Sequence, residues 1–256
     1  MSDLRLGTIG KFLGASAFSL ALIACGNGMS GSSGSSSSTT LALTTSALSG
    51  SYVFTATGTD PNDGDYSVAG SFVADGKGNI TSAVADYNLG SGVDDNVPLT
   101  GTYTVSGGTI AVTLMDGGSV KDTFNTAPIN SGSAGVSSFD GTGTGKLYAQ
   151  TTSGFSPAGT YSFSLAGEGD GTISGSGQFV AAASGAFTSG SLTLTDAQTS
   201  LTYSTVSGLL GPTAASGRGF ANIEGNNLAY YVIGPNQIQM MGIDARYLLT
   251  IPAQKM

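Results

Sequence analysis

Apolar and polar side chains alternate along most of this chain after residue 47, and this period of two constrains the fold more than any other feature. Segments 51–56 and 65–74 both place Tyr, Phe, Val, Ala or Gly at every second position. Such alternation is typical of β-strands with one buried face. Outside the first 24 residues, no window longer than a turn or two has the apolar spacing of a helix. The sequence therefore predicts an all-β protein.

Glycine-rich turns separate the expected strands. Asp75-Gly76-Lys77-Gly78-Asn79 is a strong hairpin signal, because Asp-Gly supplies the positive-φ positions of a tight turn. Gly107-Gly108 and Asp116-Gly117-Gly118 are of the same type. Further strands are expected at 80–88, 99–105, 109–115, 119–127 and 143–150.

The second half of the chain repeats the first. Gly50-Ser51-Tyr52-Val53-Phe54 matches Gly159-Thr160-Tyr161-Ser162-Phe163, and Gly70-Ser71-Phe72-Val73-Ala74 matches Gly177-Gln178-Phe179-Val180-Ala181. Two tandem β-modules are predicted, at residues 48–154 and 155–256. Six aromatic residues recur at matching places and are predicted to be core, the alternatives being a ligand cavity or sugar stacking. They are Tyr52, Phe54, Phe72, Tyr161, Phe163 and Phe179.

The end of the second module differs from a half-buried strand. Residues 228–233 are apolar on both faces, which predicts a strand buried on both sides or a closing strand. The turn Gly234-Pro235-Asn236 and strands at 237–244 and 246–251 follow. Because adjacent strand residues face opposite ways, either Tyr230 or Tyr231 should be exposed unless something covers it.

Short strands in hairpin succession predict two antiparallel modules, each a small up-and-down, lipocalin-like barrel, or alternatively a sandwich. The strands are rich in Thr, Val and Tyr and poor in charge. Exposed edges of such strands would favour aggregation, and closure into a barrel removes them. The barrel is the preferred prediction.

The N-terminus has the three parts of a secretory signal. Arg5 and Lys11 precede the uncharged run Phe12–Ala24, which is too short for a permanent membrane span, and Leu22-Ile23-Ala24 leads into Cys25. This segment resembles the lipobox of bacterial lipoproteins. The resemblance implies cleavage between Ala24 and Cys25 and lipidation of Cys25, including palmitate-type acylation. The alternative is an ordinary secreted protein in which Cys25 is incidental.

The expected organisation is thus a signal peptide (1–24), a lipidated Cys25 with a Gly/Ser-rich tether (25–47) and the two modules. In the lipoprotein family, Asp commonly follows the lipidated cysteine in proteins retained at the inner membrane. Gly26 stands there instead, which favours the cell outer membrane. The membrane is therefore the expected partner, through the lipid anchor.

A wider resemblance rests on turn and core residues. LSGSYVF (48–54), YSVAGSFVADGKGNITSA (66–83), LTGTYTV (99–105) and LAYYVIGPNQIQMMGID (228–244) look like the tandem β-modules of predicted acidobacterial lipoproteins. The resemblance implies a fold, and it brings no activity with it.

Composition excludes several classes of function. The chain has 8 basic and 16 acidic side chains, so it lacks a basic stripe for nucleic acid. It has no histidine, which removes Ser-His-Asp and Cys-His catalysis and His-based metal sites. Cys25 is its one cysteine, so no intrachain disulfide can form. No cofactor is indicated.

Two sets of carboxylates are candidate sites. Asp60, Asn62, Asp63 and Asp65 cluster like the oxygen ligands of calcium, but the EF-hand order fails, and a strand-connecting turn is the favoured interpretation. Asp94-Asp95 is interpreted as a turn in the same way. Glu168 and Glu224 are the only glutamates available for a paired-carboxylate glycoside hydrolase, and both are expected at turns.

The functional prediction is a membrane-anchored, non-enzymatic protein of the cell envelope with a structural, adhesive or interaction role. Its envelope or extracellular partner is not named by any residue. The main alternative is a carrier that holds a small apolar ligand inside a barrel. A carboxylate-dependent glycoside hydrolase is a remote third possibility.

Overall fold

The computed structural model describes residues 44–61, 64–129, 131–169, 171–196, 198–245 and 247–256. Strands dominate these residues, and the single helical element among them is a 3₁₀ turn, η1 (Thr45–Ala47). Within the described part of the chain, no helix combines the length and apolarity needed to cross a membrane. Ala24, Cys25 and residues 26–43 lie outside the described residues.

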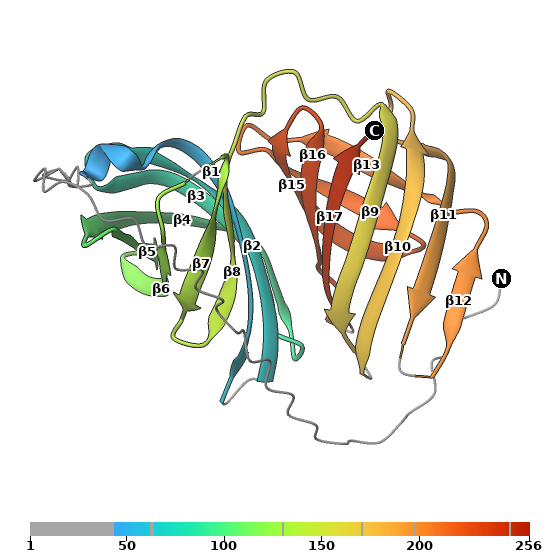
Figure 1. Cartoon of the computed structure of the whole chain (residues 1–256), viewed down its shortest axis with the longest axis horizontal. Helices are drawn as coiled ribbons and strands as arrows, with labels where there is room; N and C mark the ends of the chain where they lie inside the picture. The colour runs from blue at the N-terminus through green and yellow to red at the C-terminus, as the bar shows by residue number, and fades with distance from the viewer. Residues whose placement is uncertain (1–43, 62–63, 130, 170, 197, 246) are drawn as a thin grey trace, which may run out of the picture. The chain divides into compact units, whose positions relative to one another are not determined.

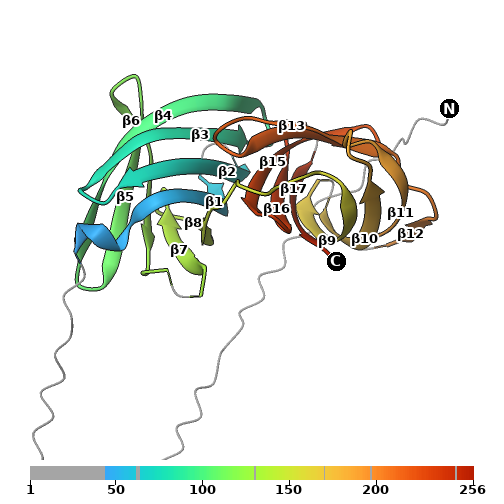
Figure 2. The same cartoon turned by 90° about the horizontal axis from the view of Figure 1, so that it is seen from above.

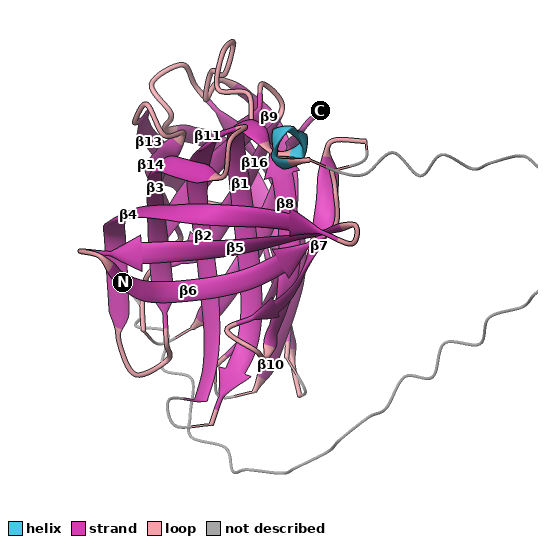
Figure 3. Cartoon of the chain, turned by 90° about the vertical axis from the view of Figure 1, so that its left-hand side faces the viewer, coloured by secondary structure: helices cyan, strands magenta, loops and turns pink. Residues whose placement is uncertain are grey.

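The first sheet is a closed antiparallel barrel in which each strand pairs with the next in sequence (Figure 1). The closing pair is β1 with β8, where Phe54 lies opposite Leu147. Figure 3 shows β4, β5 and β6 side by side in the wall. The strands are β1 (Ser49–Asp60), β2 (Gly64–Asp75), β3 (Asn79–Asn88), β4 (Val93–Ser106), β5 (Thr109–Asp116), β6 (Ser119–Thr126), β7 (Ser133–Phe139) and β8 (Gly143–Ala149).

The predicted glycine turns form the hairpins of this barrel. Between β2 and β3, Gly76 and Gly78 have φ of 74° and 106°, and Asp75 Oδ1 accepts the N–H groups of Lys77 (2.7 Å) and Asn79 (3.0 Å). Gly107-Gly108 and Gly117-Gly118 also have positive φ at both positions, as two-residue turns require.

Side chains from all eight strands fill the inside of the first barrel. Phe54, Phe124 and Phe139 stack at its centre, with ring centroids 5.5 to 6.2 Å apart. The Tyr103 hydroxyl links this core to the segment before β1, because it donates to the carbonyls of Thr45 (2.9 Å) and Leu48 (2.7 Å). Burial of these large rings is the main source of stability for such a barrel.

The second sheet has nine antiparallel strands in the order β12-β11-β10-β9-β17-β16-β15-β14-β13. It is strongly curved, and β9 pairs with β17 as β1 pairs with β8 (Figure 2). Its strands are β9 (Gly159–Glu168), β10 (Thr172–Ala181), β11 (Phe187–Thr195), β12 (Ser200–Tyr203), β13 (Gly208–Thr213), β14 (Arg218–Ile223), β15 (Asn226–Gly234), β16 (Gln237–Gly242) and β17 (Leu248–Lys255).

This second sheet is open, because β12 and β13 follow one another in the chain without pairing. β13 instead contacts the β10–β11 turn, where Leu210 N–H donates to the Gly185 carbonyl (2.9 Å) and Leu209 bridges Ala186. Pro212 also removes a donor from β13. The all-β, two-sheet prediction is therefore confirmed, and the predicted closure is found in the first sheet, whereas the second is a half-barrel.

Equivalent residues pair in the same way in both sheets. Tyr52 lies opposite Phe72 and Tyr161 lies opposite Phe179, with ring centroids 5.3 and 4.9 Å apart. Gly70 lies opposite Phe54, and Gly177 lies opposite Phe163 in the second sheet. All six recurring aromatic residues are buried, so the prediction that they form the core is confirmed.

Candidate functional site

Polar side chains are buried on both sides of the barrel wall at β3. In this strand Ala85 and Tyr87 face the barrel interior, whereas Val84, Asp86 and Asn88 face outward. Asp86 and Asn88 are fully buried, although neither lies in the barrel core. Buried polar groups need partners, and those of β3 come from distant parts of the chain.

A bulge in β4 shapes the outer surface at Asp86. Ala85 pairs with Val97 and Tyr87 pairs with Asp94, so Asp95 and Asn96 together oppose the single residue Asp86. Asn96 has φ of 55°, a left-handed conformation that Asn tolerates. Its N–H consequently turns to the Asp86 carboxylate at 2.7 Å. Bulges of this kind re-aim groups at special sites.

The second sheet supplies the other partners of Asp86. Arg218 and Tyr231, which lie opposite each other in β14 and β15, both reach its carboxylate. Arg218 Nε is 2.9 Å from Oδ2 and Nη2 is 2.6 Å from Oδ1, and Tyr231 Oη donates to Oδ2 at 2.5 Å. This bidentate, charge-assisted arrangement is the strongest polar contact available to Arg and a carboxylate. We call Asp86, Arg218 and Tyr231 the interface triad.

The electrostatics of the interface triad follow from its burial. Burial raises the pKa of Tyr231 well above its ordinary value, and the charge of Asp86 raises it further. Burial acts to lower the pKa of Arg218, but the hydrogen bonds and charge of Asp86 outweigh it and the net pKa is raised. Tyr231 therefore remains a neutral donor and Arg218 remains a cation.

Apolar and amide contacts continue the same interface between the two sheets. Val53, Ala69 and Val84 pack against Ala229, Tyr231, Ile233 and Met241. Asn88 Nδ2 lies 3.0 to 3.1 Å from the carbonyls of Gly242, Asp244 and Tyr247, and Gln150 Nε2 donates to those of Ser216 (3.0 Å) and Val232 (2.8 Å). Tyr230 and Tyr231 are both fully buried, because the outer wall of the barrel covers Tyr231.

On the inner side of β3, Tyr87 reaches across to β6. Its hydroxyl donates a short hydrogen bond to Asp122, and Lys121 Nζ lies 4.7 Å from the centre of its ring. Burial raises the pKa of Asp122 to about 7, although the hydrogen bond from Tyr87 acts to lower it, and the neighbouring Asp140 carboxyl adds to the rise. The pKa of Tyr87 is also raised, mainly by burial and by Asp122. We call Tyr87, Asp122 and Asp140 the barrel acid cluster.

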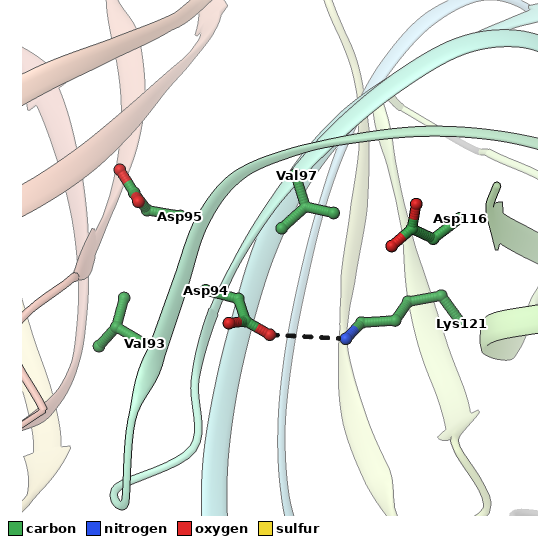
Figure 4. A pocket seen from close by; sticks show the side chains of 6 residues that line it. All are labelled: Val93, Asp94, Asp95, Val97, Asp116 and Lys121. Carbon is green, nitrogen blue, oxygen red and sulfur yellow. Dashed lines mark ion pairs between the residues drawn. The ribbon is translucent and has the colours of Figure 1, made fainter.

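An open pocket of about 380 Å³ lies beside this cluster, lined by Val93, Asp94, Asp95, Val97, Asp116 and Lys121 (Figure 4). Lys121 Nζ is 3.6 Å from Asp94 Oδ2, and Asp116 lies on the Lys121 side of the pocket. Asp95 lies on the opposite side, where its Oδ2 is 3.7 Å from Arg218 Nη2. The pocket is polar and mainly acidic, and a cation or amine suits its charge better than an apolar ligand.

The candidate sites predicted from the sequence are not brought together. Asp60 ends β1 and Asp65 lies in β2, where it accepts a hydrogen bond from Thr59 Oγ1 (2.7 Å), while Asn62 and Asp63 are outside the described residues. Across the described ranges, no group of three or more His, Cys, Asp or Glu side chains could hold a metal ion.

The two glutamates have local partners. Glu168 ends β9 and accepts a hydrogen bond from Thr172 Oγ1 (3.0 Å). Glu224, in the β14–β15 turn with φ of 51°, accepts the N–H of Ser207 (2.5 Å). Their contacts are those of turn residues.

Asp94 and Asp95, by contrast, lie in β4, so the prediction of a turn there was wrong. The two buried acids, Asp86 and Asp122, were not singled out from the sequence. The sequence signal that could have identified them is a carboxylate within a strand whose other residues are mainly apolar or carry hydroxyl groups, because such an acid is buried only when it is paired.

Comparisons with known proteins place the chain among distant structural neighbours. No protein-family profile matches it, and no curated protein sequence does either. A solved structure described as a putative AttH from Nitrosomonas europaea is 8% identical, with a TM-score of 0.27, over 80% of this chain and 92% of that one. Kievitone hydratase from Nectria haematococca is 10% identical, with a TM-score of 0.24, over 82% of this chain and 91% of that one.

Proposed function

We propose that the protein is a lipid-anchored, non-enzymatic protein of the bacterial cell envelope, held at the outer membrane, with a structural or adhesive interaction role. One observation carries the non-enzymatic part. The fully buried polar side chains on the outer face of β3, Asp86 and Asn88, are used to join the two sheets. Their chemistry therefore holds the molecule together and is not offered to a substrate.

The filled interior of the first barrel supports the same proposal. Phe54, Phe124 and Phe139 occupy its centre in stacking contact, where a carrier would hold its ligand. The chain is also poor in charge on its strands and acidic overall, with a formal net charge of −8. This composition suits a soluble body displayed on a tether.

The lipid anchor is tested by metabolic labelling of cells with radiolabelled palmitate. The wild-type protein is expected to take up label and to remain with the membrane fraction. Cys25→Ser should abolish labelling, whereas Met29→Ala, a change in the tether, should leave labelling intact. Equal labelling of the Cys25→Ser protein would contradict the proposal.

The adhesive or structural role predicts that the two sheets face the outside of the cell. Limited treatment of intact cells with proteinase K is expected to release peptides from residues 48–256. A periplasmic protein of known location serves as the control for cell integrity. Release only after the cells are broken would exclude an adhesive role on the cell surface.

A carrier of a small apolar ligand is the second candidate, and the open half of the second sheet favours it. Phe187, Leu194 and Tyr203, next to the gap between β12 and β13, are only partly buried against the core of this sheet. Organic extraction of protein purified from its native envelope, followed by mass spectrometry, distinguishes the candidates. A stoichiometric apolar molecule would favour the carrier, and its absence would favour the non-carrier role.

A further inference from the structure

We propose that the seam between β6 and β7 is a pH-responsive gate of the first barrel, which is closed when Asp122 is protonated and loosened when Asp122 and Asp140 are both charged. The proposal concerns the first barrel alone and does not depend on the proposed envelope role. It rests on the pairing of the two strands, on their backbone conformation and on the groups that face Asp122.

The seam is held by very few ladder pairs. β6 and β7 pair only at Asn125 with Ser137 and at Thr126 with Val136. By comparison, the β1–β2 ladder is unbroken: it begins where Ser49 pairs with Asp75 and ends where Asp60 pairs with Gly64. Elements with few backbone hydrogen bonds open most easily, so this seam is the expected point of local opening.

Asp140 supplies hydrogen bonds between β6 and the end of β7 where the ladder pairs are missing. Its N–H donates to the Thr123 carbonyl (2.8 Å), and its Oδ1 accepts the Thr123 N–H (2.7 Å). Asp140 therefore ties the end of β7 to the middle of β6. Displacing the Asp140 carboxylate would remove one of these two hydrogen bonds, which lie past the last ladder pair at Ser137.

The backbone at this tie is already unfavourable. Ser138 and Asp140 have φ of 52° and 44°, which are left-handed values for residues other than glycine, and the β7–β8 register shifts between Val136 and Phe139. Such conformations persist only where the surrounding contacts enforce them. A loss of contacts at Asp140 would release the strain and move the equilibrium toward opening.

The side chains of Asp122 and Asp140 act on the same part of β6, because Asp140 Oδ1 accepts the N–H of Thr123, the residue that follows Asp122. The negative charge of Asp140 adds to the rise in the pKa of Asp122. Two neighbouring carboxylates repel each other when both are charged, so the charge of Asp140 opposes ionisation of Asp122. Other groups that act on the pair, directly or through Tyr87, come from the five strands β2 to β6. They are Tyr87 in β3, Lys121 in β6 with its partner Asp94 in β4, Tyr66 in β2, and Asp116 at the end of β5.

The direction of the response follows from the raised pKa of Asp122, which is about 7 in the folded protein against an ordinary value of 3.8. Protonated Asp122 stabilises the seam, and this contribution is complete below about pH 4. It is lost as the pH rises through about 7. Phe124 and Phe139 lie on the two elements that separate, so opening would admit solvent or an apolar molecule to the centre of the barrel.

Hydrogen–deuterium exchange on the intact protein tests the gate. Protection factors, which correct for the intrinsic effect of pH on exchange, are compared at pH 6 and pH 8. The amides of Thr123 and Asn125, whose backbone groups face β7, are expected to lose about tenfold in protection at pH 8. Amides of the β1–β2 ladder are the internal reference and should change little. Equal protection of the seam at both pH values would overturn the proposal.

Three variants separate the gate from a general effect of charge. Asp122→Asn mimics the protonated acid and should make seam protection independent of pH. Asp65→Asn, which removes an exposed charge elsewhere in the first barrel, should keep the wild-type response. Asp140→Asn retains an oxygen for Thr123 but removes the opposing charge, so the transition should move to lower pH. An unchanged midpoint in Asp140→Asn would contradict the proposal even if Asp122→Asn failed to fold.

Discussion

Asp86 and Tyr87 are neighbours in β3, and their side chains act on opposite sides of the barrel wall. Asp86 joins Arg218 and Tyr231 of the second sheet, whereas Tyr87 holds Asp122 inside the barrel. Alternation along a strand thus gives one dipeptide two separate structural roles. Each role can therefore be tested by a substitution of its own.

Removal of the charge at Asp86 tests the outer role. Asp86→Asn leaves Arg218 buried without its full counter-charge, and we expect the free energy of unfolding to fall by about 3 kcal/mol. Asp95→Asn is the matched control, because Asp95 is 62% exposed and lies 3.7 Å from the same guanidinium. Its cost should be below about 1 kcal/mol. Urea denaturation measures both, and equal losses would show that burial of Asp86 is not decisive.

Removal of the Tyr87 hydroxyl tests the inner role. Its hydrogen bond lowers the pKa of Asp122, so Tyr87→Phe should raise that pKa further above 7. The variant should also lose about 1 to 3 kcal/mol of stability through the unsatisfied carboxyl group. Tyr103→Phe, another buried tyrosine of this barrel, should leave the Asp122 titration unchanged. Carbon-13 NMR of the Asp122 carboxyl follows the pKa, and a fall in Tyr87→Phe would refute the assignment.

At the scale of the strand, glycines opposite phenylalanines set the packing of both sheets. A Cβ on Gly70 would lie 2.5 Å from the Phe54 ring, and one on Gly177 would lie 2.7 Å from the Phe163 ring. We therefore expect Gly70→Ala and Gly177→Ala each to cost about 1 to 3 kcal/mol through overpacking. Gly135→Ala in β7 is the control, because a methyl group there would meet no described atom within 4 Å. Thermal unfolding should show a lower Tm only for the first two variants.

The strands and hairpins were predictable from the sequence because their signals are local. Asp75–Asn79 contains its own turn chemistry, and the aromatic residues of β1 and β2 show their common face by period. The buried acids were not predictable in this way. Asp86 and Arg218 are 132 residues apart and Tyr87 and Asp122 are 35 apart, and alternation gives the face of a side chain without naming its partner.

The two elements that were predicted incorrectly or incompletely show the same limit. Asp94-Asp95 has turn-like composition, yet both residues lie in β4, where Asp95 is part of the bulge that turns the Asn96 N–H toward Asp86. The gap in the second sheet depends on contacts of β13 with the β10–β11 turn, about 25 residues away in sequence. Tertiary contacts decided both features.

At the scale of the whole molecule, we expect the interface to make the stabilities of the two sheets dependent on one another. The described residues between 44 and 256 lie in one compact unit that contains both. The contact combines an apolar patch around Val53 and Ile233 with the fully desolvated interface triad. The hydroxyls of Ser67 and Ser71, on the same outer face of β2 as Ala69, are buried and have no hydrogen-bond partner among the described residues, which is a cost that the other contacts must offset.

This dependence predicts a single unfolding transition that one interface substitution can divide. Tyr231→Ala removes a fully buried ring and the hydroxyl donor to Asp86, at a cost of about 3 to 5 kcal/mol, almost all of it at the interface. Calorimetry of the wild-type protein should give one transition with equal calorimetric and van't Hoff enthalpies, and the variant should give two. Tyr103→Ala, which removes a comparable ring from inside the first barrel, should lower Tm and keep the transitions together. Two transitions in the wild-type protein would mean that the interface triad positions the sheets without coupling their stability.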